Sequence, residues 1–215
     1  LSSLVQDICT AGYSSLNTEK LEVYSERIIS GFSDCIKNDK QIKPEYRQLS
    51  AFTSHGYITR ELDENYSVYV LKDDMFAASD FLLRKLNERF CSSGYKTYIS
   101  KSAAFDEIIY EHILIPELKT AFMSSGFFSE YQNTNGTEIS LKRFYDKKIL
   151  SEKKNYISFS KKAANEIKQA VTDTIDTALN IHDELEKYYI SSLETDSLNE
   201  FTENFIRTLN NKSFI

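Results

Sequence analysis

Glycine and proline are scarce in this sequence, whose 215 residues include six Gly, two Pro and no Trp. Average usage is about 7% Gly and 5% Pro. The shortage excludes collagen-like repeats and Pro-rich linkers, and it disfavours β-sandwiches, which need many tight turns. Long helices with a few strands between them are favoured instead. The shortage also bears on phosphate binding, because the loops that wrap a phosphate are built from glycines.

Cysteine is rare as well, and long apolar runs are missing. Cys9, Cys35 and Cys91 are too few for a disulfide framework, and no Cys-x-x-Cys pair exists. Reduced thiols in a cytoplasmic protein are the expected state. No apolar run reaches the ~18–20 residues that cross a bilayer, and residues 1–14 lack the basic start of a signal peptide. We therefore expect cytoplasmic localisation and no membrane contact.

Positive charge is in the minority, with 26 Lys and Arg against 32 Asp and Glu and a net charge of −6. An acidic domain repels the phosphate backbone, so we expect no nucleic-acid partner. A local basic cluster is interpreted as a solvated helix face. It consists of Lys142, Arg143, Lys147, Lys148, Lys153 and Lys154.

The apolar residues that are present follow helical and strand patterns. Steps of three and four residues predict amphipathic helices over 18–37, 75–92 and 160–190, and a last helix that begins at Ser197. Short β-branched runs over 67–71 and 95–99 predict buried strands. Two further strand candidates, 113–115 and 119–123, are separated by Pro116, which argues against one uninterrupted strand.

Strand, helix, glycine turn and strand over 67–99 are typical of a βαβ unit. We predict an α/β fold with a parallel sheet of the P-loop type flanked by helices, and with long helical segments at both ends. The predicted organisation is a helical segment over 1–40, an α/β core over 45–150 and a long helical region over 151–215.

The junction after the first strand is where an α/β sheet of this kind holds its ligand. In a P-loop, glycines let backbone N–H groups wrap a phosphate, a Lys neutralises it and a Ser or Thr binds Mg²⁺. Residues 72–81 have the right place and length but contain no glycine, so close approach of a phosphate is sterically impaired. Asp73, Asp74 and Asp80 would repel a triphosphate, and Lys72 lies at the strand end rather than in the first helical turn.

Five stretches of the chain match a known pattern: Tyr69-Val70-Leu71-Lys72, Leu82-Leu83-Arg84-Lys85-Leu86, Gly94-Tyr95, Glu111-His112-Ile113-Leu114-Ile115-Pro116-Glu117-Leu118 and His182-Asp183-Glu184-Leu185-Glu186-Lys187-Tyr188-Tyr189-Ile190. Together they resemble a family of bacterial P-loop ATPase-like proteins built from two tandem P-loop halves, each followed by a long helical segment. The resemblance covers residues 45–192 and is most specific in Ile-Pro-Glu-Leu and His-Asp-Glu-Leu-Glu.

In that family the strand is followed by Gly-Gly-Pro-Gly-Thr-Gly-Lys-Ser-Thr, which falls on residues 73–81 here. Ser79 stands in place of the family's Lys, Asp80 in place of its Mg²⁺-binding Ser, and all four of its glycines are replaced. The resemblance thus makes Asp73, Asp74, Ser79 and Asp80 degenerate phosphate-loop positions. A Walker B motif also needs an acid at the end of a hydrophobic strand, and residues 119–123 are followed by two serines.

The resemblance further implies that residues 1–38 are the tail of an upstream half. The chain starts at Leu1 rather than at Met, and residues 19–24 are similar to residues 183–188, a similarity that a chance match of charged helix surfaces would also explain. Both observations fit a second half of a longer two-repeat protein.

Other polar residues are candidate sites, and a structural role is favoured for each. His112, beside Glu111 and near Glu117, could act as a general base, but a capping role is favoured. His182 and Glu186 are spaced to place two metal ligands on one helix face, yet no third ligand is apparent, so a simple pair is favoured and no metal is expected. His55 lies in a Ser-His-Gly turn.

We therefore expect a degenerate, non-hydrolysing P-loop ATPase-like domain, a pseudoenzyme without catalytic residues and with a structural or regulatory role. It would pair with an intact ATPase half or subunit, or associate with itself. No cofactor is expected, and weak ATP binding stays open. The alternative is a mainly helical protein-interaction module, which the absence of a parallel sheet beside residues 67–72 would favour. A third hypothesis is an enzyme with a metal site rebuilt from Asp73, Asp74, Asp80, His112 or Glu117.

Overall fold

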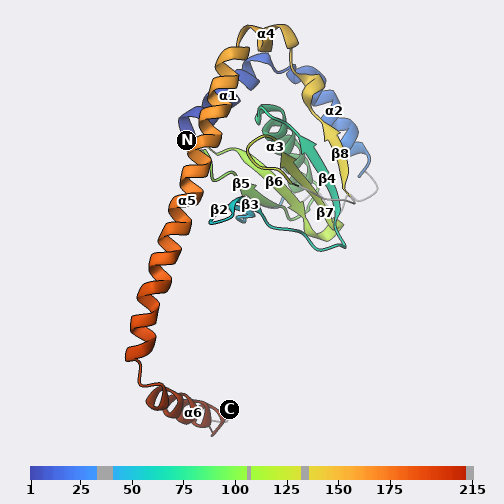
Figure 1. Ribbon diagram of the computed structural model, residues 1–215. Coiled ribbons are helices and arrows are strands. Elements are labelled where there is room, and N and C mark those ends of the chain that lie inside the picture. Colours follow the sequence, from blue (N-terminus) through green and yellow to red (C-terminus); the bar gives the residue numbers. More distant parts are fainter. Residues whose placement is uncertain (33–40, 106–107, 132–135, 212–215) are drawn as a thin grey trace. The chain divides into compact units, whose positions relative to one another are not determined.

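The computed structural model describes residues 1–32, 41–105, 108–131 and 136–211 (Figure 1). Its strands include β1 (Glu45–Tyr46), β4 (Ser67–Lys72), β5 (Tyr98–Lys101), β6 (Tyr110–Ile115), β7 (Thr120–Ser125) and β8 (Thr137–Ser140). These six strands form one sheet in the order β1-β5-β6-β7-β4-β8. The predicted strands over 67–71, 113–115 and 119–123 are confirmed, and the one predicted over 95–99 begins at Tyr98.

The sheet is mostly parallel, as predicted, with one reversed strand. β4 pairs in parallel with both β7 and β8, and β1 pairs in parallel with β5. β6 is antiparallel to both of its neighbours, β5 and β7. The reversal follows from the connection between β6 and β7, a short 3₁₀ turn that begins at Pro116 and ends where Lys119 adopts a left-handed φ of 46°. So short a connection can only join antiparallel strands.

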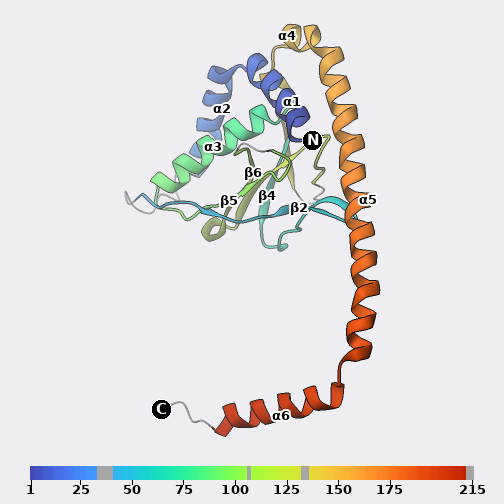
Figure 2. The ribbon, with the colours of Figure 1, turned by 90° about the vertical axis from the view of Figure 1, so that its left-hand side faces the viewer.

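Three helices cover one face of the sheet (Figure 2). They are α1 (Ser2–Ser15), α2 (Thr18–Ser30) and α3 (Ala77–Ser92). The predicted helix over 18–37 is confirmed as far as Ser30, and the rest of it, including Cys35, extends into residues outside the described part. Asn17 caps α2, because its side chain accepts the N–H of Lys20 at 2.9 Å. The main core lies between these helices and the sheet, with Ile8, Leu21, Leu82, Leu86 and Phe122 among its buried members.

The opposite face of the sheet carries a smaller apolar cluster. Val68, Val70 and Met123 are buried there beneath Leu49 and Tyr66. A separate hairpin, β2 (Ser50–Thr53) and β3 (Gly56–Thr59), follows Leu49 in the chain. Its turn contains His55, as predicted, and Gly56 adopts a φ of 108° that other residues rarely adopt.

The C-terminal part is helical, as predicted. It comprises a 3₁₀ turn η3 (Lys142–Phe144) and three helices, α4 (Lys147–Glu152), α5 (Lys154–Ser192) and α6 (Thr195–Asn211). Two compact units are distinguished: Leu1–Asp173, called the N-terminal unit below, and Thr174–Ile215, called the C-terminal unit. Within the N-terminal unit, α1 and α2 share one core with the sheet, and the division into three segments stays a prediction. Within the described part of the chain, every helix is too short or too polar to cross a bilayer.

Candidate functional site

The loop between β4 and α3 lies where the sequence predicted a ligand junction. β4 ends at Lys72, α3 begins at Ala77, and residues 73–76 connect them. β7 and β8 flank β4 in parallel (Figure 1), so the loop leaves the carboxyl edge of the parallel strands. Ligands of α/β proteins bind at this edge.

The carboxylate of Asp73 occupies the N-terminus of α3. Asp73 is 2% exposed. Its oxygens accept the N–H of Ser79 at 2.8 Å and the N–H of Met75 at 3.0 Å, and Tyr145 donates its hydroxyl to both oxygens at 2.8 and 2.9 Å. A helix N-terminus attracts an anion, because its first N–H groups lack partners within the helix and the helix dipole is positive there. The anion at this helix is therefore a side chain of the protein itself.

Burial raises the pKa of the Asp73 carboxyl above its usual range, and the hydrogen bonds from Ser79, Met75 and Tyr145 lower it in part. The contact also changes the pKa of the phenol, because burial and the neighbouring Asp73 raise the pKa of Tyr145. The two groups are thus held together as a buried pair in which the phenol is the donor.

All four N–H groups in the first turn of α3 have partners inside the protein. The N–H of Ala77 donates to the Met75 carbonyl at 2.7 Å, and that of Asp80 donates to the Phe76 carbonyl at 2.9 Å. The N–H of Ala78 donates to the Tyr145 hydroxyl at 2.8 Å, and Ser79 donates to Asp73 as described. A phosphate at this helix would have to displace one of these acceptors.

The loop is closed tightly by backbone from two sides. A Cβ on Gly12 of α1 would lie 2.9 Å from the Met75 carbonyl oxygen, and a Cβ on Gly126, directly after β7, would lie 2.3 Å from the Asp73 carbonyl oxygen. Phe76 adopts a left-handed φ of 63° within the loop, a conformation that costs on the order of 1 kcal/mol for a residue with a side chain. Its ring packs against Phe105 and Phe127, with centroids 5.0 and 5.7 Å apart.

The four predicted phosphate-loop positions therefore make different kinds of contact. Asp73 and Ser79 meet at the helix N-terminus. Asp80 is buried and points away from the loop, where it accepts from Arg84 at 2.8 Å, from the N–H of Tyr110 at 2.7 Å and from the Tyr13 hydroxyl. It ties together α1, α3 and β6. Asp74 remains partly exposed and accepts the N–H of Phe127 at 3.1 Å.

Asp74 faces an open hollow of about 520 Å³ at the carboxyl edge of the sheet. Lys72 also lines it, with its Nζ 3.3 Å from Glu138 and 3.4 Å from Ser125 Oγ. Around Asp74 lie the Nζ atoms of Lys161 at 3.7 Å and Lys142 at 4.0 Å. The lining contains three carboxylates, Asp74, Glu130 and Glu138, against two lysines, Lys72 and Lys142, so the hollow has no surplus of positive charge for a triphosphate.

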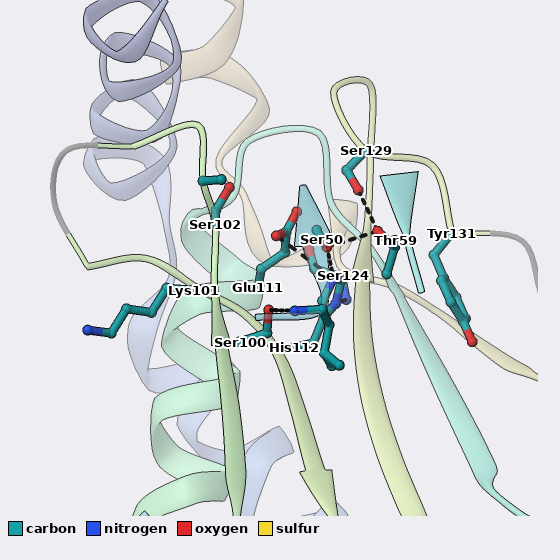
Figure 3. A network of polar contacts seen from close by, with 12 residues as sticks. Ser50, Thr59, Ser100, Lys101, Ser102, Glu111, His112, Ser124, Ser129 and Tyr131 are labelled. Carbon is teal, nitrogen blue, oxygen red and sulfur yellow. Dashed lines mark hydrogen bonds and ion pairs between the residues drawn. The ribbon is translucent and has the colours of Figure 1, made fainter. Parts of the chain in front are cut away.

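His112 belongs to a second, buried polar network (Figure 3). Its Nδ1 accepts the N–H of Ser124 at 3.2 Å, so the ring hydrogen is on Nε2, which lies 2.8 Å from Ser50 Oγ. Ser50 Oγ contacts Thr59 Oγ1 at 2.9 Å, and Glu111 accepts the hydroxyl of Tyr57 at 2.9 Å. Burial raises the pKa of Glu111 to about 7 and lowers the pKa of His112 to about 3.

This network has the residue types of a serine hydrolase but a different geometry. A general base must accept the serine proton, whereas Nε2 of His112 donates to Ser50. Glu111 lies 3.8 Å from the same Nε2 rather than beside Nδ1, and Ser50 is fully buried. The contacts instead fasten the β2–β3 hairpin to β6, a structural role of the kind favoured for His112.

The other candidates lie apart from the junction. Glu117 lies in the turn between β6 and β7, at the edge of the sheet opposite the Asp73 loop, and accepts the N–H of Lys96 at 3.4 Å. His182 and Glu186 lie in the C-terminal unit, where Asp183 joins them, and their ligand atoms fall within 4.8 Å of one another. All three side chains are exposed. Asp183 is the third group that sequence spacing missed, because it is adjacent to His182 rather than one turn away.

Two groups at the junction are not predicted by any local sequence pattern. Tyr145 reaches Asp73 from 72 residues further along the chain. Gly12 approaches the loop from the first helix. No protein-family model, curated protein or solved structure matches the chain.

Proposed function

We propose that the N-terminal unit is a degenerate P-loop ATPase-like domain that does not hydrolyse ATP and has a structural or regulatory role. The observation that carries the proposal is the set of internal partners at the start of α3. Each N–H group that would bind a phosphate is already paired, one of them with the Asp73 carboxylate. A nucleotide would have to replace these bonds and overcome the repulsion of a buried anion.

The surroundings of β4 support an ATPase-like ancestry. An interior strand with parallel neighbours on both sides, followed by a loop and a helix, is the arrangement that carries a P-loop. A Walker B acid would stand at the end of a neighbouring strand. β7 ends instead in Ser124 and Ser125, both buried, and Ser125 Oγ accepts the N–H of Tyr131 at 3.1 Å.

The alternatives fit less well. The mainly helical hypothesis required that no parallel sheet adjoin residues 67–72, and β4 has two parallel partners. The rebuilt metal site required its acids to converge. Asp73 and Asp80 are instead bonded to different internal donors, and Glu117 lies at the other edge of the sheet.

In this proposal the domain provides surfaces for contact with a protein partner and does not turn over ATP. The resemblance in residues 45–192 names the partner class, an intact P-loop ATPase half or subunit. A domain whose junction is already filled can hold its shape in such an assembly without a bound nucleotide.

The direct test is calorimetric titration of the full chain with ATP, ADP and GTP, with and without Mg²⁺. We expect no binding up to about 1 mM, a level that corresponds to less than about 4 kcal/mol of binding free energy. Phosphate release should equal that of buffer. The Asp73→Asn variant is the matched control, because it keeps the side-chain volume and removes the charge. Mg²⁺-dependent ATP binding in the micromolar range with turnover would refute the proposal.

A further inference from the structure

The C-terminal unit exposes a continuous apolar stripe along α5. Ile175, Ala178, Leu185 and Tyr189 recur at alternating steps of three and four residues, with His182 in the same series. These are the a and d positions of a heptad, the pattern with which helices pair in coiled coils. Leu185 and Tyr189 are 52% and 71% exposed.

The positions beside this stripe carry four large apolar side chains, one threonine and one charge. Thr174, Ile181 and Tyr188 occupy the g positions, and Leu179, Glu186 and Leu193 occupy the e positions. Charged residues normally fill e and g in a helix that has water beside its seam. Their replacement by large apolar side chains widens the stripe well beyond what a solvated helix presents.

The second helix of this unit repeats the pattern with its charges turned away. Leu198, Phe201, Phe205 and Leu209 lie on one face of α6, and all are exposed. Asp196, Glu200, Glu203 and Arg207 recur at steps of four, three and four, which places them on the opposite face. Thr, Ser and Asn flank the apolar face.

The exposed apolar area is large enough for a stable interface. Twelve large apolar side chains between Leu179 and Leu209 are 42–73% exposed. They leave roughly 1,400 Å² of surface in water, against about 800 Å² per partner in a standard interface. Burial of little more than half of this surface would therefore suffice.

The charge distribution selects the occupant. Residues 174–215 contain eight Asp and Glu against three Lys and Arg, a net charge of −5 out of −6 for the chain. A basic partner would pair with acids beside the apolar faces, but among the e and g positions of α5 only Glu186 is acidic, and on α6 the acids lie opposite the apolar face. A second copy brings apolar face to apolar face and leaves the acids in water.

We infer that residues 175–209 form a helical interface with a second copy of this chain, in which the α5 segments pair in parallel and in register. Parallel pairing sets Ile181 beside Glu186 and Tyr188 beside Leu193 of the second copy, so like charges do not meet. The inference goes beyond the function proposed for the N-terminal unit, because it does not depend on whether the Asp73 loop binds nucleotide.

The oligomeric state of the full chain tests the inference by sedimentation velocity over a range of concentrations. We expect a dimer that tightens as salt rises from about 50 to about 500 mM, because salt screens the repulsion between the acidic faces. Binding to a partner of opposite charge weakens with salt instead. A monomer at about 100 µM, or a dimer that dissociates as salt rises, overturns the inference.

Two matched variants test whether the interface lies on the apolar stripe of α5. Leu185→Glu adds a charge at a d position and should weaken the dimer more than about tenfold. Asn180→Glu adds the same charge on the outer face and should change the dissociation constant of the dimer less than about twofold. Both residues are exposed, so folding, followed by circular dichroism, should be unchanged. Equal dimerisation of the wild type and the Leu185→Glu variant overturns the inference.

Disulfide trapping tests the parallel register. Under mild oxidation the Leu185→Cys variant should form a covalent dimer, because d positions of a parallel pair approach within disulfide reach. The Asn180→Cys variant should not. A Leu185→Cys dimer no more abundant than that of the Asn180→Cys control contradicts parallel pairing. ATP binding, measured separately, bears only on the proposed function of the N-terminal unit.

Discussion

Replacing Asp73 by glycine should empty the anion position at the start of α3. The change leaves the N–H of Ser79 without its acceptor and the buried hydroxyl of Tyr145 without its carboxylate. Loss of a cap-like acceptor costs about 1 kcal/mol, a buried unpaired donor costs about 1–3 kcal/mol, and a glycine in the loop adds about 0.5–1 kcal/mol. Relief of the buried charge offsets part of this cost.

We therefore expect a net destabilisation of about 3 kcal/mol, which lowers the Tm by about 6–12 °C for a unit of this size. Acetate should restore part of the loss, because it matches the CH₂–COO⁻ group that the substitution removes. At ten times its dissociation constant, acetate would return about 1.4 kcal/mol, or about 3–6 °C.

The assay is thermal unfolding in acetate against chloride at equal ionic strength. The wild type should have the same Tm in acetate as in chloride. The same holds for the Asp73→Asn variant, whose side chain keeps the position filled. A Tm of Asp73→Gly within about 2 °C of the wild type would refute the reasoning, because that shift corresponds to less than about 1 kcal/mol. An acetate effect of the same size on all three proteins would refute it too.

Three further substitutions test the surroundings. Glu111, with a folded pKa of about 7, contributes stability that is complete below pH 4.5 and is lost as pH rises through 7, whereas His112, with a folded pKa of about 3, contributes stability that is complete above pH 6.5 and is lost as pH falls. Between pH 4.5 and 6.5 the two slopes oppose each other, so the unfolding free energy of Glu111→Gln minus that of the wild type, measured by urea titration, should rise by about 1.4 kcal/mol per pH unit. A difference that stays constant over this pH range would contradict this account. Gly126→Ala places a Cβ against the Asp73 carbonyl and should lower stability by about 1–3 kcal/mol in thermal unfolding. Gly31→Ala, with its nearest contact at 3.2 Å, is the milder control, and equal losses would argue against tight packing at the loop. Asp80→Asn should cost about 1–3 kcal/mol by the same measurement, because Arg84 and the N–H of Tyr110 share its carboxylate, and an unchanged Tm would contradict that role.

The local patterns in the sequence predicted the elements of the N-terminal unit well. Periodicity placed α2, α3 and β4, and Pro116 marked the break that became the turn between β6 and β7. The reversed direction of β6 was not predicted. Adjacent apolar runs specify strands but not their direction, and only the left-handed Lys119 turns the chain back within three residues.

The junction was located correctly from the sequence, but its chemistry needed long-range contacts. The missing glycines predict that residues 72–81 do not wrap a phosphate, and this stays a prediction. The role of Asp73 as an anion could not be predicted from the local sequence, because Tyr145 and Gly126 reach it from two distant segments, and Gly12 approaches the neighbouring Met75 from a third. Likewise, Ser50, itself bonded to Thr59, meets His112 only because the β2–β3 hairpin lies against β6.

The Asp73 carboxylate is, in effect, a ligand attached by a covalent bond. A diffusible phosphate leaves its site at a rate set by its affinity, and its occupancy follows its concentration in the surroundings. A tethered carboxylate has an effective concentration fixed by the backbone, and it never dissociates while the loop is folded. The conformation at the start of α3 should therefore be the same whether nucleotide is abundant or exhausted. In an assembly whose other members cycle through nucleotide states, such a domain would be a fixed point of reference against which their motion is transmitted.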